Sequence, residues 1–193
     1  MKKLLLSVIT ACGMMSAQAA LIEYSATLNG PSEFPVNSSP GIGFGLVNYD
    51  DVAHTLQVQV TFSGLQGTTS AAHIHAPTTA PFFQNAGVAT TGGAGFAGFP
   101  LGVTSGTYSN TLDLTQASSW NGSFVTANGG TPAGAESALA SAMAGGLAYF
   151  NIHSSSFGGG EIRGFLVPVP EPSALALFGV GAGVIAWRLR RKH

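Results

Sequence analysis

Two histidines, His73 and His75, stand two residues apart in the segment AAHIHAP, although the whole chain contains only five histidines. On a β-strand, residues i and i+2 project to the same face, so both imidazoles would point together. The segment YFNIH at residues 149–153 repeats this spacing and places Asn151 and His153 on one face. Neutral imidazoles that share one surface can bind zinc or copper. The pattern therefore suggests a metal site formed by His73, His75 and His153.

A third polar pair, Glu161 and Arg163, follows glycines at positions 158–160 and would also share one face of a strand. In a metal site, Glu161 would serve as a fourth ligand or as a group that orients an imidazole. We expect Arg163 to pair with Glu161 or another carboxylate, because an unpaired buried charge is unfavourable. The alternative needs no cofactor: the histidines would hydrogen bond to Asn151, Glu161 and backbone carbonyls in a structural network, together with Arg163, that pins the sheet.

Strands are expected wherever apolar and polar residues alternate, most clearly over residues 54–62. Other expected strands cover residues 22–28, 41–49, 71–75, 87–91, 107–114, 147–153 and 161–167. Residues 131–145 predict one short helix, because Thr131 can cap it, Pro132 suits its first turn and Gly145 can end it. A shorter helical turn is expected near 116–120, and the glycine-rich residues 92–106 predict a loop.

Many short strands separated by turn residues predict a mainly β fold, an antiparallel β-sandwich or barrel of the immunoglobulin-like or superoxide dismutase-like Greek-key type. Residues 20–167 form one domain by length and contain seven acidic residues and one basic residue, a net charge of −6. Such a surface cannot neutralise phosphates, which excludes nucleic acid as a partner. The domain has no glycine-flanked nucleophile elbow, phosphate loop or cofactor fingerprint, so we expect no enzymatic activity.

The N-terminal residues 1–19 have the features of a secretory signal peptide. Lys2 and Lys3 precede a short apolar stretch, and small residues ending at Ala19 offer a cleavage site. Cys12 is the only cysteine, and its context loosely resembles a lipoprotein processing site. Cleavage after Ala19 removes Cys12 and leaves the mature protein without disulfides.

The C-terminal residues 168–193 contain a VPEP motif at 169–172, an uncharged apolar run at 174–187 and a basic end at 188–192. As a helix, the apolar run would reach about 21 Å, short of a hydrocarbon core of about 30 Å. The simplest interpretation of this tail is a transmembrane helix that anchors the protein permanently. The order of features also resembles a PEP-CTERM sorting signal, with Pro170, Glu171 and Pro172 as its motif. That resemblance implies export in a Gram-negative bacterium, transient insertion in the inner membrane, and recognition by an exosortase-type protease before release to the cell surface or exterior.

The central segment is similar to the CHRD (chordin-type) domain over about residues 21–167. The similarity rests on SATLNG at 25–30 with Glu33 and Pro35, and on HIHAP, YFNIH and GEIRG at 73–77, 149–153 and 160–164. The chain departs from the family at Ala76, where glycine is common, and at Phe157-Gly158-Gly159, where a proline often precedes the Gly-Gly-Glu sequence. The resemblance implies an extracellular β-rich domain without established enzymatic activity.

Two functions are therefore expected from the sequence. The first is a non-catalytic surface or matrix module that binds extracellular polysaccharide or matrix proteins. The second is a zinc or copper protein, with or without redox chemistry, that uses the histidine cluster. The four histidines of the domain are too few for the two-metal site of copper–zinc superoxide dismutase, so only a single-metal site is open.

Overall fold

A computed structural model describes residues 21–170 of the protein. Three predicted features lie outside these residues: the signal peptide with its cleavage site at Ala19, the apolar tail helix, and Glu171 and Pro172 of the sorting motif. No helix within 21–170 combines the length and the apolar character needed to cross a bilayer.

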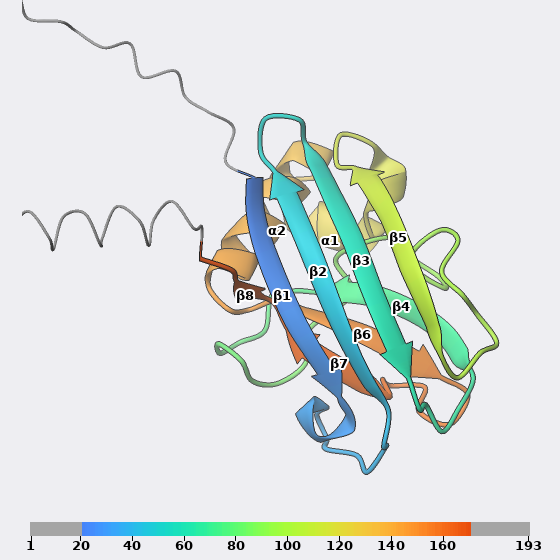
Figure 1. The fold of residues 1–193 in the computed structure, drawn as a ribbon. Coiled ribbons are helices and arrows are strands. Elements are labelled where there is room, and N and C mark those ends of the chain that lie inside the picture. The colour runs from blue at the N-terminus through green and yellow to red at the C-terminus, as the bar shows by residue number, and fades with distance from the viewer. Residues whose placement is uncertain (1–20, 171–193) are drawn as a thin grey trace, which may run out of the picture.

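A single antiparallel sheet contains all eight strands of the described structure, in the order β4-β6-β7-β1-β2-β3-β5, with β8 paired to β1. The strands are β1 (Leu21–Asn29), β2 (Ile42–Asp50), β3 (Thr55–Ser63), β4 (Thr69–His75), β5 (Gly106–Asp113), β6 (Tyr149–Ser154), β7 (Ile162–Phe165) and β8 (Val167–Pro168). Figure 1 shows the sheet folding over on itself, so that β4, β6 and β7 cross behind β1, β2, β3 and β5. The mainly β, antiparallel fold is confirmed, and the sheet has the form of a half-barrel.

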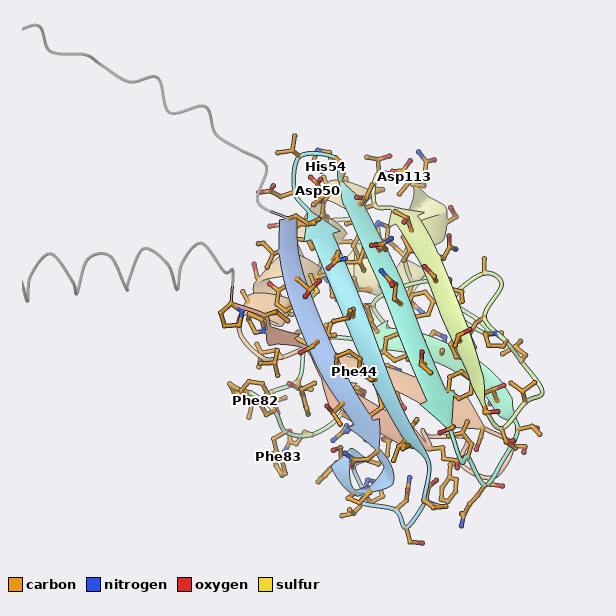
Figure 2. All side chains as sticks on the ribbon, in the orientation of Figure 1. Phe44, Asp50, His54, Phe82, Phe83 and Asp113 are labelled. Carbon is orange, nitrogen blue, oxygen red and sulfur yellow. The ribbon has the colours of Figure 1, made fainter. Side chains whose placement is uncertain are left out.

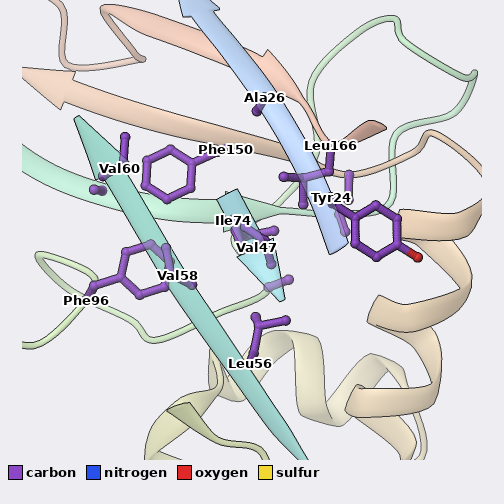
Figure 3. Close-up of a cluster of buried hydrophobic side chains, with 14 of the residues drawn as sticks. Tyr24, Ala26, Val47, Leu56, Val58, Val60, Ile74, Phe96, Phe150 and Leu166 are labelled. Atoms are coloured by element: carbon purple, nitrogen blue, oxygen red, sulfur yellow. The ribbon is translucent and has the colours of Figure 1, made fainter. Parts of the chain in front are cut away.

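The core lies between the two halves of this folded sheet (Figure 3). On β3, Leu56, Val58, Val60 and Phe62 are buried while the residues between them are more exposed, as the alternation predicts. On β6, the residues that face the core are Phe150 and Ile152, both fully buried. Tyr149, Asn151 and His153 must therefore project from the opposite face of this strand.

Helices occupy the connection between β5 and β6, namely η2 (Ala117–Ser119), α1 (Gly122–Ala127) and α2 (Pro132–Ala144); η1 (Gly30–Ser32) follows β1. The helix α2 begins after Thr131, whose hydroxyl accepts from Gly134 N at 3.1 Å, and it ends at Gly145, as the sequence predicts. The helix α1 was not predicted, although Asn121 caps it by accepting from Ser123 N at 2.9 Å.

Two predicted strands differ in the structure. Residues 87–91 form only isolated bridges, His75 with Val88 and Thr90 with Trp120. Ile74 O accepts from the consecutive main-chain N–H groups of Ala89 and Thr90, and this geometry cannot continue as a ladder. The predicted strand 161–167 is divided into β7 and β8.

Candidate metal site

The side chains of His73, His75 and His153 meet on the face of the β4–β6 pair that points away from the core. In the antiparallel register, Ala71 lies opposite His153 and His73 lies opposite Asn151, so the three histidines are close neighbours across the two strands. One nitrogen from each ring can be chosen so that all three lie within 4.8 Å of one another. The structure thus brings together the three residues that the sequence pattern selected.

Each of these imidazoles is held by one hydrogen bond to a main-chain carbonyl. The bonds are His73 Nε2 to Gly93 O at 3.1 Å, His75 Nδ1 to Ala86 O at 2.9 Å, and His153 Nδ1 to Gly158 O at 3.0 Å. A carbonyl oxygen only accepts, so the bonded ring nitrogen must be the one that has the hydrogen. In a neutral ring, the other nitrogen then offers a lone pair.

Those other nitrogens are His73 Nδ1, His75 Nε2 and His153 Nε2. All three are buried, and none has a hydrogen-bond partner within residues 21–170. Loss of hydration on burial lowers the pKa of His73 and of His75 from 6.5 to about 4, and it also lowers the pKa of His153. The rings are therefore neutral near pH 7, the form in which imidazole binds metals.

The geometry of the cluster is compatible with one zinc or copper ion. Tetrahedral zinc binds histidine nitrogens at about 2.0–2.1 Å, which places the ligand atoms about 3.4 Å apart. One nitrogen from each ring lies within 4.8 Å of the other two, so closing around an ion through these atoms would bring them together by at most about 1.4 Å. The carbonyl bonds fix the ring orientations in the way that outer partners of metal ligands commonly do.

The structure does not bring Glu161 to the histidines. Its fully buried carboxylate accepts from Ser39 Oγ at 2.6 Å and from the main-chain N–H groups of Gln66 and Gly67. Burial opposes ionisation, but hydrogen bonds from Ser154, Ser39 and these N–H groups lower the pKa of Glu161. The strand β7 begins only at Ile162, so the alternation that would place Glu161 beside Arg163 does not extend to it. The predicted fourth ligand is thus a structural group that ties the segments around residues 39 and 66 to the sheet.

Arg163 pairs with a different carboxylate, Glu33, at 3.9 Å from Nε to Oε2. Burial raises the pKa of Glu33 to about 7, although the Arg163 guanidinium acts to lower it. The predicted network of Asn151, Arg163 and Glu161 does not form within the described residues, and Asn151 Oδ1 is buried without a partner. The histidines do bond to main-chain carbonyl groups, as the structural alternative expected, but they do not bond to these side chains.

Tyr149 connects the histidines to Arg163 and was missed in the sequence. Its ring stacks on His75 with centroids 4.9 Å apart, and the Arg163 guanidinium carbon lies 4.7 Å from the same ring. The sequence did contain a signal for this residue, because Tyr149 is two residues before Asn151 and must lie on the same face of the strand. The contact of Arg163 with Glu33 had no such signal, because it joins segments 130 residues apart.

These features define a class of protein: a folded-over antiparallel β-domain with three converging neutral histidines on the face opposite its core. The chain belongs to the CHRD domain family, whose model matches residues 24–166. Residues 168–192 match the PEP-CTERM protein-sorting motif. The protein is therefore exported and sorted by an exosortase, with transient membrane anchoring at its C-terminus before surface or extracellular localisation. No curated protein and no solved structure matches the chain.

Proposed function

We propose that the exported domain is a non-catalytic binding module that holds one zinc or copper ion through His73, His75 and His153. A single observation supports this proposal: three histidines whose rings each place a nitrogen within 4.8 Å of the other two also each keep one buried nitrogen without a hydrogen-bond partner in residues 21–170. One ion would satisfy all three at once.

A purely structural role for the histidines explains these lone pairs less well. A buried acceptor without a partner destabilises a fold by about 1–3 kcal/mol. A water molecule has only two hydrogens and could donate to two of the three nitrogens, so one lone pair would remain unpaired. A metal ion accepts electron density from all three nitrogens and requires no hydrogen.

The ligand set favours zinc or copper over magnesium or calcium. Neutral imidazoles suit zinc and copper, whereas magnesium and calcium prefer oxygen ligands, and the cluster contains no carboxylate. Three protein ligands leave a fourth position of a tetrahedral ion for water or another ligand. The cluster also lacks an acidic side chain that could act as a general base beside this position, which favours binding over catalysis.

Metal analysis of the exported protein tests this proposal, with His75→Ala as the site variant. The matched control is His54→Ala, because the His54 side chain is half exposed and lies at Glu136, 3.0 Å away, outside the cluster. We expect about one equivalent of zinc or copper in the wild type and in the control, and none in His75→Ala. Circular dichroism checks that each variant is folded, and His153→Ala provides a second site variant.

Near-zero metal in all the proteins, after incubation with zinc and with copper, would show that the cluster is structural. Equal occupancy in wild type and His75→Ala would show that the metal binds elsewhere.

A further inference from the structure

Three phenylalanine rings are exposed together at one end of the molecule. Phe82 and Phe83 lie on the loop that follows β4 and are 56% and 51% exposed, and Phe34 lies after η1 and is 42% exposed. Phe34 and Phe83 meet edge to face, with ring centroids 5.3 Å apart. Figure 2 shows Phe82 and Phe83 on a loop that extends beyond the sheet. We refer to Phe34, Phe82 and Phe83 as the aromatic platform.

The loop that presents these rings adopts an unfavourable backbone conformation. Phe82 and Gln84 have φ angles of +58° and +67°, in the left-handed region that residues with a Cβ rarely adopt. Such conformations persist only where the surrounding structure holds them, and they are concentrated at binding and catalytic sites. The main-chain N–H of Phe82 donates to Gly146 O at 2.9 Å, and its ring packs on Phe165.

Arg163 fixes both segments of the platform at once. Its guanidinium donates to Gln84 O at 2.9 Å, to Asn85 Oδ1 at 2.7 Å and to Ser32 O. The Asn85 amide then donates to Phe34 O at 2.6 Å. A buried cation and a strained loop thus hold the rings toward solvent. Because their orientation is set before binding, little entropy would be lost when a partner binds.

The charge of the domain restricts what this partner can be. The described residues contain seven acidic groups, and their single cation, Arg163, is only 3% exposed. Acidic polysaccharides, anionic lipids and a second copy of the same domain would all be repelled. An uncharged partner meets no such barrier.

The chemistry of the platform matches an uncharged sugar chain. An aromatic face is electronegative and attracts the polarised C–H groups on the flat side of a sugar ring. The polar neighbours Thr79 and Gln84, which hydrogen bond to each other, are uncharged groups beside the rings that can meet sugar hydroxyls. We infer that the aromatic platform binds a neutral polysaccharide chain. This inference is independent of the metal proposal and uses a different surface.

Affinity electrophoresis of the exported protein tests the inference. Native gels would contain mixed-linkage β-glucan, galactomannan or dextran as neutral probes, and alginate as an acidic probe. The site variant is the double substitution Phe34→Ala with Phe83→Ala. Its control is Phe44→Ala, because Phe44 is equally exposed, at 51%, but lies on β2 (Figure 2).

We expect at least one neutral polysaccharide to retard the wild type and Phe44→Ala, with affinity about tenfold weaker in the double variant. Alginate should retard none of them. If circular dichroism shows that the double variant is unfolded, the single variant Phe83→Ala replaces it, because the Phe83 ring is half exposed.

Three results would overturn the inference. The first is no retardation by any of the neutral probes, and the second is an equal loss of affinity in Phe44→Ala. The third is a concentration-dependent dimer of the wild type that the double variant abolishes, which would identify a second copy of the chain as the occupant.

Discussion

Acidification of the metal-free protein should destabilise it strongly between pH 6.5 and 4, because the histidine cluster is buried in its neutral form. The pKa of His73 and of His75 lies at about 4 in the folded chain and at 6.5 when the ring is fully hydrated. Between these values the unfolded chain binds protons that the folded chain does not bind. The free energy of unfolding must then fall as the pH falls, and the loss is complete below about pH 4.

The size of the effect follows from these values. A fall in pKa from 6.5 to about 4 corresponds to about 3–4 kcal/mol for each histidine, and so about 7 kcal/mol for the two. Glu33 acts in the opposite sense, because its pKa is raised from 4.5 to about 7. The folded chain binds this proton more readily, which offsets about 3 kcal/mol over the same range. From these three groups a net loss of about 3–4 kcal/mol between pH 7 and pH 4 remains, and the lowered pKa of His153 and of Glu161 acts in the same direction as that of His73 and His75.

Urea unfolding of metal-free protein at pH 7, 5.5 and 4 measures this loss. Glu33→Gln removes the opposing group, and we expect its stability to fall more steeply with acidification than that of the wild type. A free energy of unfolding that is constant from pH 7 to 4 would refute the reasoning. Histidine pKa values near 6.5 for His73 and His75, read from NMR titration, would refute it as well.

Two substitutions test the groups around the cluster. Glu161→Gln should lower the free energy of unfolding by about 2–3 kcal/mol, because it weakens hydrogen bonds to a buried carboxylate. The zinc or copper content of this variant should equal that of the wild type. A loss of metal from the folded variant would instead identify Glu161 as a ligand. Gly160→Ala should destabilise by more than about 2 kcal/mol in the same urea assay, because φ is +131° and a Cβ would lie within 2.7 Å of atoms of Asn151 and Glu33. Gly158→Ala, where a Cβ meets nothing within 4 Å, should be close to neutral, and equal effects of the two alanines would contradict the packing argument.

Strands such as β2 and β3 could be predicted because one face of each is buried and the other is more exposed, whereas most residues of β4 and β6 are buried on both faces. The alternation over residues 54–62 located β3 to within one residue at each end. The segment 87–91 was wrongly predicted as a strand. A short run of small and β-branched residues is equally compatible with a strand and with a loop that bonds to the edge of a strand. Helix α1 is only six residues long, with glycine at its first position, and its composition is unlike that of a stable helix.

The histidine cluster was accessible to sequence reasoning because the i and i+2 spacing alone places His73 beside His75. Its third member required the pairing of β4 with β6, which is set by the tertiary fold. The position of Glu161 could not be predicted, because it depends on β7 beginning one residue later. The aromatic platform depends on Arg163 joining loops that are distant in the sequence, and no local pattern reports such a contact.

Anomalous X-ray scattering from crystals of the exported protein, recorded at the zinc and copper absorption edges, tests the metal site most directly. We predict one peak about 2.0–2.1 Å from each of His73 Nδ1, His75 Nε2 and His153 Nε2. Crystals grown with added zinc or copper that show no peak between these nitrogens, or that show ordered water bonded to them, would contradict the proposal.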